Sequence, residues 1–291
     1  MQTKDDLPSR VRRLHVRSRK LVESLFAGNY HSVFKGPGLE FDEVRDYEYG
    51  DDVRFIDWNV SSRMAAPYSK TFKEERELVL FVLVDVSASL SMGSSGVNKR
   101  EVAGNLFALL ALAAVANNDK VGCLLFSNQV ERLIVPMTGR KHVLRQISEV
   151  LGHKAFGSGS DLSAALRSAS QNLKRKSIVV LLSDFRCEGY QSEMNLLARK
   201  HDVIAIRLTD PMDKVFPDTG LVELEDPETG EGFTAWGKSK ALKKEYAEFW
   251  DDQRLIWLDI CRSAGVDTLE VGTDEEPADS LLAFFRRRRG A

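Results

Sequence analysis

Short apolar runs alternate with amphipathic segments from residue 78 onward, and this alternation constrains the fold more than any other feature of the chain. The apolar runs, which predict strands, span residues 78–84, 120–126, 130–135, 177–183, 203–208 and 266–271. The segments that predict helices span residues 99–116, 140–151, 162–173 and 190–200. Alternating strands and helices form a mostly parallel sheet with helices on both faces. We therefore expect an α/β, doubly wound domain over residues 78–291.

Two appended regions accompany this domain. Residues 8–27 predict an N-terminal helix, with Pro8 suited to its start and Gly28 to its end. From residue 30 to 77, glycines, aromatics and alternating charges predict short extended strands and turns. We expect residues 1–77 to pack on the main domain as a separate segment. Near the other end, residues 221–236 predict a hairpin insertion, followed by a long helix.

Composition excludes several classes of protein. The 41 basic and 43 acidic residues leave a net charge of −2, which provides no general attraction to nucleic acid or to an anionic membrane. The three cysteines form no CxxC pair, which argues against a zinc cluster and a disulfide scaffold. The most apolar run, residues 106–116, is shorter than the roughly 20 residues that a membrane span needs. With no apolar signal segment at the N-terminus, we expect a cytoplasmic protein without a membrane partner.

Oxygen-bearing side chains follow two of the predicted strands. Asp85, Ser87 and Ser89 occupy alternate positions directly after the first strand, and Asp184 ends a second one. Ser160 lies in the glycine-containing loop GSGSDL between them. Ligands of open α/β sheets bind at the carboxyl ends of the strands. We therefore expect these five residues to converge on one site.

Hard oxygen ligands of this kind favour Mg²⁺, with Mn²⁺ or Ca²⁺ as alternatives. Serine hydroxyls are neutral, so Asp85 and Asp184 alone would offset the charge of a dication. An open coordination position would favour a carboxylate, and we expect a protein partner to supply it. The competing interpretation is that these residues only cap helices, as Asp and Ser commonly do after a strand. We assign that simpler role to Asp161.

The five residues resemble the metal-ion-dependent adhesion site of von Willebrand factor A domains, whose pattern is DxSxS, then a threonine, then an aspartate after a later strand. Asp85, Ser87, Ser89 and Asp184 match this pattern, whereas Ser160 stands where threonine is usual. Serine keeps the hydroxyl but lacks the methyl group that restricts the rotamers of threonine. We expect Ser87 and Ser89 to ligate the metal directly, Asp85 directly or through a water, and Ser160 variably. Asp184 is expected to act through a water or from behind the residues that contact the metal.

A second resemblance covers nearly the whole chain. The segments GPGLEFDEVRDYEYGDDVRFIDWNVSSR, LVELEDPETGE and VGTDEEPADSLLAFFRRR are similar to the bacterial domain-of-unknown-function family 58. Members of that family are often encoded beside MoxR-type AAA+ ATPases. The resemblance implies an adaptor to such an ATPase in complex assembly or maturation, without enzymatic activity. The charged and aromatic residues 36–63 form either a docking surface or a clasp on the main domain, with Trp58 as an anchor.

Two alternative functions stay open on the sequence. A haloacid-dehalogenase-like magnesium phosphatase would use a strand-end aspartate such as Asp85, but its second aspartate is replaced by Ser87. A nucleic-acid-binding protein would rely on the basic N-terminal helix and the four arginines at 286–289. A terminal run of charge is more often a solvated tail.

Overall fold

The computed structural model describes residues 40–48, 51–64, 66–73, 78–94, 96–157, 159–225 and 232–290. The helix predicted at residues 8–27 and the turn of the predicted hairpin lie outside these ranges. Between residues 40 and 73 the chain forms one compact unit, and from residue 78 it forms another. The prediction that the smaller unit packs on the larger one stays a prediction. No helix of the described residues is long and apolar enough to cross a membrane.

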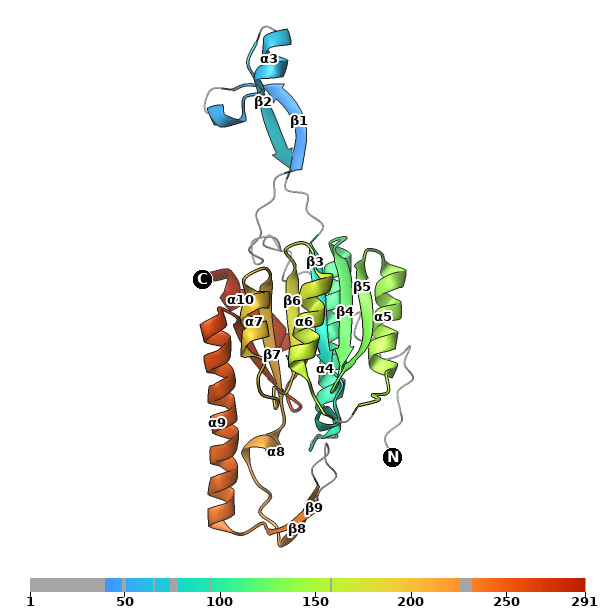
Figure 1. The fold of residues 1–291 in the computed structure, drawn as a ribbon, viewed down its shortest axis with the longest axis vertical. Helices are drawn as coiled ribbons and strands as arrows, with labels where there is room; N and C mark the ends of the chain where they lie inside the picture. Colours follow the sequence, from blue (N-terminus) through green and yellow to red (C-terminus); the bar gives the residue numbers. More distant parts are fainter. Residues whose placement is uncertain are drawn as a thin grey trace. The chain divides into compact units, whose positions relative to one another are not determined.

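A six-stranded sheet forms the centre of the larger unit, in the order β10-β7-β6-β3-β4-β5 (Figure 1). Its strands are β3 (Val79–Asp85), β4 (Lys120–Phe126), β5 (Val130–Met137), β6 (Ile178–Ser183), β7 (Asp202–Thr209) and β10 (Asp267–Gly272). All neighbours are parallel except β5, which runs antiparallel to β4 at the edge. The predicted doubly wound, mostly parallel sheet is thus confirmed.

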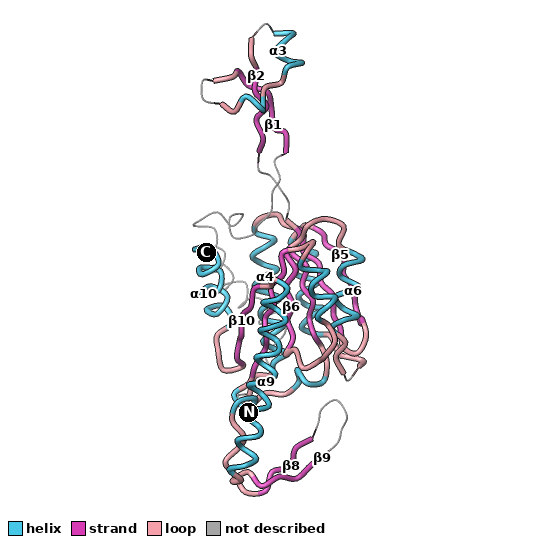
Figure 2. The backbone as a smooth tube through the Cα atoms, turned by 60° about the vertical axis from the view of Figure 1, so that its left-hand side comes forward, coloured by secondary structure: helices cyan, strands magenta, loops and turns pink. Residues whose placement is uncertain are grey.

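Helices cover both faces of this sheet (Figures 1 and 2). The helices on one face are α4 (Lys99–Ala116), α5 (Arg140–Gly152) and α10 (Pro277–Gly290). Those on the other face are α6 (Leu162–Asn172), α7 (Gln191–Ala198) and α9 (Lys240–Ala264). Strand β3 lies between the layers: Leu80, Val82 and Val84 pack toward α4, and Phe81 and Leu83 toward α6. Because both faces are covered, nearly every residue of β3 is apolar.

The hairpin expected near the C-terminal end is present. Strands β8 (Leu221–Glu225) and β9 (Gly232–Trp236) pair antiparallel, with Leu221 opposite Trp236. A short helix, α8 (Pro211–Lys214), precedes the hairpin and directly follows β7. The hairpin is therefore an insertion after the carboxyl end of β7, at the same edge of the sheet as Asp85.

The smaller unit is a two-stranded antiparallel sheet of β1 (Glu40–Asp46) and β2 (Tyr68–Lys73). Between the strands lie the turn η1 (Val53–Phe55) and the helix α3 (Trp58–Met64), which the sequence did not predict. Ion pairs connect charged side chains of the unit, among them Arg45–Asp51 at 2.7 Å, Arg54–Asp52 at 2.6 Å and Lys70–Asp57 at 3.3 Å. Trp58 is 70% exposed, so it does not anchor this unit internally.

Helix α10 corrects one expectation, because part of the arginine run is not a solvated tail. Leu281, Phe284 and Phe285 are buried against the sheet, and Arg288 follows one turn later on the same face. Its guanidinium forms ion pairs with Asp202 and with Asp267, the latter at 2.9 Å from Nε to Oδ2. These aspartates begin β7 and β10, so Arg288 ties the last helix to two strands.

Replacing Arg288 by Ala should lower the free energy of unfolding by about 2 kcal/mol, because the largely buried Asp202 carboxylate loses a charged hydrogen bond and the exposed Asp267 carboxylate loses an ion pair. The control is Arg287→Ala, since Arg287 is exposed on the same helix. Urea unfolding of both variants measures the difference. Equal stability of the two variants would contradict the role of Arg288.

Gly93 is required where the loop after β3 folds back on the start of α4. A Cβ atom at Gly93 would lie 2.2 Å from the Val97 carbonyl oxygen and 2.6 Å from the Asn98 Cα atom. Asn98 is the N-cap of α4, and its side chain accepts a hydrogen bond from the Glu101 amide at 2.8 Å. Any larger residue at 93 must therefore displace backbone atoms at the cap.

Gly93→Ala should lower the free energy of unfolding by about 1–3 kcal/mol through this overlap. Gly152→Ala is the matched control, because no atom lies within 4 Å of the added Cβ at the end of α5. It should leave stability unchanged or raise it by up to about 1 kcal/mol. The prediction fails if both substitutions have the same effect in urea unfolding.

Candidate metal centre

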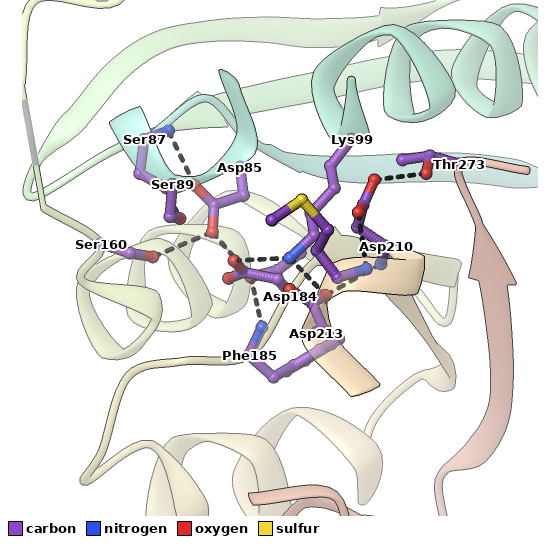
Figure 3. Close-up of polar contacts among 12 residues, drawn as sticks. Asp85, Ser87, Ser89, Lys99, Ser160, Asp184, Phe185, Asp210, Asp213 and Thr273 are labelled. Carbon is purple, nitrogen blue, oxygen red and sulfur yellow. Dashed lines mark hydrogen bonds and ion pairs between the residues drawn. The ribbon is translucent and has the colours of Figure 1, made fainter. Parts of the chain in front are cut away.

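The loop after β3 gathers three oxygen-bearing side chains out of solvent (Figure 3). Asp85 is the last residue of β3, and Ser87 and Ser89 lie at the start of the turn η2 (Ala88–Ser91). Asp85 Oδ1 accepts a hydrogen bond from the Ser87 amide at 2.9 Å, and the two serine hydroxyls lie 3.1 Å apart. All three residues are at most 1% exposed. The tight turn therefore directs these oxygens to one place.

The other two predicted residues meet this loop from different elements. Ser160, just before α6, donates its hydroxyl to Asp85 Oδ2 at 3.0 Å. Asp184 follows β6 and is buried beside Asp85 (Figure 3). The structure thus brings together all five residues that the sequence singled out. Their role as metal ligands stays a prediction.

Ser183 is a residue of this site that the sequence analysis missed. Its hydroxyl donates to Asp85 Oδ2 at 2.6 Å and accepts from the Phe185 amide at 3.0 Å. Ser183 is the last residue of β6, and a hydroxyl immediately before the strand-end aspartate was the available signal. Its hydrogen bonds fix the Asp85 carboxylate relative to the end of β6.

The Asp184 carboxylate has no such support. It is 2% exposed, and neither of its oxygens has a hydrogen-bond partner among the described residues. A buried charge without hydrogen bonds is costly. An ion or partner group that contacts these oxygens would therefore be strongly favoured.

Burial and the nearby negative charge of Asp184 raise the pKa of Asp85 to about 6, although hydrogen bonds from Ser183 and Ser87 oppose the shift. Both causes of the increase reflect an acidic pair enclosed in a poorly polarisable environment. A divalent cation between the two carboxylates would reverse the effect. The electrostatics of the site therefore favour a bound cation.

The simpler interpretation, in which these residues only cap helices, agrees less well with the geometry. Ser87 precedes η2 but makes no side-chain capping hydrogen bond. By contrast, Asp161 accepts a hydrogen bond from the Ala164 amide at 2.9 Å and caps α6, as predicted. One aspartate of the region is therefore a cap, while Asp85 and Asp184 face each other.

The donor set consists of two carboxylates and three hydroxyls, all of them oxygen. In the described part of the chain, no group of three or more His, Cys, Asp or Glu side chains is arranged to hold a metal ion. Zinc sites normally need such nitrogen- and sulfur-rich sets. Magnesium accepts few protein oxygens and keeps several waters, so the residues present fit Mg²⁺ or Mn²⁺ better.

A buried lysine borders the site and was also missed. Lys99, the first residue of α4, is 2% exposed, and its Nζ lies 3.7 Å from Asp184 Oδ2 and 2.7 Å from Asp213 Oδ2 (Figure 3). The sequence placed Lys99 only at a helix start, where lysine is normally solvated. Its burial depends on carboxylates that lie far away along the chain.

Asp213 is itself held in a second polar network. Its Oδ2 accepts the Asp210 amide at 2.9 Å, which forms a capping box at the start of α8. The Asp210 carboxylate in turn accepts the hydroxyls of Ser94 and Thr273, both at 2.6 Å. The ends of β7 and β10 and the loop after β3 are thereby connected next to the candidate metal centre.

The chain is similar to solved structures at low sequence identity. The chain is similar to an aerotolerance-related membrane protein from Bacteroides fragilis, with a TM-score of 0.50 and 14% identity, covering 73% of this chain and 98% of that chain. It is also similar to a von Willebrand factor type A structure from Catenulispora acidiphila, with a TM-score of 0.41 and 11% identity, covering 76% and 43% of the two chains. Such low identities concern the fold alone.

Comparison with other protein sequences covers a larger part of the chain. An uncharacterised protein of Mycobacterium tuberculosis is 29% identical over 290 residues, which cover 98% of this chain and 91% of that protein. The family described as "Protein of unknown function DUF58" matches residues 43–255, more than half of the chain. The chain therefore belongs to the DUF58 family.

Proposed function

We propose that this protein is a metal-dependent protein interaction module. Asp85, Ser87, Ser89, Ser160 and Asp184 would hold Mg²⁺, or Mn²⁺ or Ca²⁺ in its place. The observation that supports this most directly is the Asp184 carboxylate, which is buried beside Asp85 with neither oxygen hydrogen-bonded in the described structure. A bound cation would satisfy that carboxylate and connect the ends of β3 and β6.

Charge balance suggests what such a site binds. Asp85 and Asp184 offset one dication, and the serine hydroxyls add oxygen ligands without charge. When bound, the metal would provide a positive centre for an anionic ligand at an open coordination position. A carboxylate of an aspartate or glutamate on a partner protein would fit that position.

The proposed partner is a MoxR-type AAA+ ATPase, for which the protein would act as an adaptor in complex assembly or maturation. This part rests on the family resemblance of the sequence. It also fits a domain that offers an open carboxyl edge of a sheet, where α8 and the hairpin β8–β9 follow directly after β7. Partner-specific contacts are commonly made by such loops.

An interaction role agrees better with the site than the two alternatives do. A phosphatase of the haloacid-dehalogenase type needs an acid two residues after the nucleophile, and Ser87 occupies that position with its hydroxyl 3.1 Å from that of Ser89. Nucleic-acid binding through the C-terminal arginines is weakened because Arg288 is ion-paired to Asp202 and Asp267. We therefore propose a non-catalytic function.

Asp184→Asn tests the metal site with little change in shape. The substitution removes one of two charged ligands and should weaken Mn²⁺ and Mg²⁺ binding by at least about tenfold in calorimetric titrations. Because neither Asp184 oxygen has a hydrogen-bond partner among the described residues, the variant should remain folded. Asp252→Asn, at an exposed position of α9, is the control. Equal affinities of the wild type and Asp184→Asn would overturn the metal site.

The partner is tested by co-purification with the ATPase in the presence of Mg²⁺ and after its removal by chelation. We expect retention only with Mg²⁺ and only for the wild type, because Asp85→Ala removes a charged metal ligand. A circular dichroism spectrum of Asp85→Ala is the control that checks whether the variant is folded. Retention that is independent of both the metal and Asp85 would contradict an interaction through this site.

A further inference from the structure

Lys99 is a fully buried cation beside the candidate metal centre. It is 2% exposed, and lysine is almost never buried to this extent without a partner. Its Nζ lies 2.7 Å from Asp213 Oδ2, 3.7 Å from Asp184 Oδ2 and 5.5 Å from the centre of the Trp250 ring. The two carboxylates and the aromatic face offset the cost of removing the ammonium group from water.

The position of Lys99 in its helix gives it no other electrostatic support. Lys99 is the first residue of α4, where the helix dipole is positive and disfavours a cation. The carboxylates of Asp184 and Asp213, together with the Trp250 ring, are therefore what hold the ammonium group there. In the described structure, Asp184 has an ion pair with Lys99 but no hydrogen bond to either oxygen.

We propose that Lys99 is an internal counter-cation that competes with the metal for the Asp184 carboxylate. Asp213 sets the metal affinity because it binds the Lys99 ammonium group and keeps it from neutralising Asp184. The proposal rests on the metal site of the proposed function. An ammonium group and a dication that share one carboxylate repel each other. When the metal binds at Asp184, the charge of Lys99 must therefore be neutralised by Asp213.

Asp213 is well placed to act as the alternative partner. Its Oδ2 accepts from both Lys99 Nζ and the Asp210 amide, so the carboxylate is fixed at the start of α8. Asp210 is fixed in turn by Ser94 and Thr273. A rigid carboxylate can retain the ammonium group when the metal arrives, which makes Lys99 and Asp213 positioning residues for the metal.

The two substitutions that separate these roles are expected to change the affinity for Mn²⁺ in opposite directions. Lys99→Met removes the competing charge and should tighten Mn²⁺ binding by about tenfold. Asp213→Asn leaves Asp184 as the remaining carboxylate within 4 Å of Lys99 in the described structure, and should weaken Mn²⁺ binding by about tenfold. Lys99→Arg keeps the charge and should stay close to the wild type.

The measurement is a calorimetric Mn²⁺ titration of the full chain as wild type, Lys99→Met, Lys99→Arg, Asp213→Asn and the double variant Lys99→Met/Asp213→Asn. In the double variant, the weakening caused by Asp213→Asn should disappear, because no ammonium group remains to be held aside. A merely structural role of Lys99 would lower the melting temperature of the variants without raising the affinity for Mn²⁺.

The outcomes separate this inference from the proposed function. If the wild type binds Mn²⁺ through Asp184 but Lys99→Met binds it no more tightly, the proposed competition by Lys99 is overturned, whereas the proposed metal site is supported. If neither the wild type nor Lys99→Met binds Mn²⁺, both proposals fall. Should Lys99→Met not fold, Asp213→Asn decides: unchanged affinity overturns the inference, and weakened affinity that Lys99→Arg does not share supports it.

Discussion

Burial of strand β3 on both faces is the constraint on which the rest of the larger unit depends. Leu80, Val82 and Val84 fill one layer and Phe81 and Leu83 the other, so the strand has no polar side chain before its end. Asp85 is then the first charged group at the carboxyl edge, and it is 0% exposed. Because the neighbouring strands β6 and β7 are parallel to β3, their ends also deliver Asp184 and Asp210 to that edge. The sheet thereby concentrates carboxylates where solvent is excluded.

Such a concentration of negative charge requires compensation. Asp210 obtains it from the hydroxyls of Ser94 and Thr273, and Asp85 from Ser183, Ser160 and the Ser87 amide. Asp184 has no hydrogen bond among the described residues, and its ion pair there is with the ammonium group of Lys99, at 3.7 Å. The carboxylate with the least support therefore lies between an internal cation and the proposed metal position.

Much of the fold follows from local patterns in the chain. The apolar runs predicted each strand of the main sheet to within two residues at either end, because a doubly covered strand must be apolar throughout. The helix α10 was missed, since its buried Leu281, Phe284 and Phe285 precede four arginines that suggested a tail. In the smaller unit, α3 was missed because its seven residues bury no side chain and so have no helical apolar pattern. Short, exposed elements have little apolar patterning from which the sequence could predict them.

For the candidate site, the sequence by itself determined which oxygen ligands are available and at which strand ends they lie. The spacing of Asp85, Ser87 and Ser89 and the end of the strand at Asp184 are local features, and parallel strands bring them together. The tertiary structure alone decided the roles of Ser183 and Lys99. Lys99 and Asp213 are far apart in the chain, and Lys99 becomes a buried ion-pair partner because β6 and α8 place carboxylates beside the start of α4. Burial of a charge depends on what packs around it, and no local pattern specifies that.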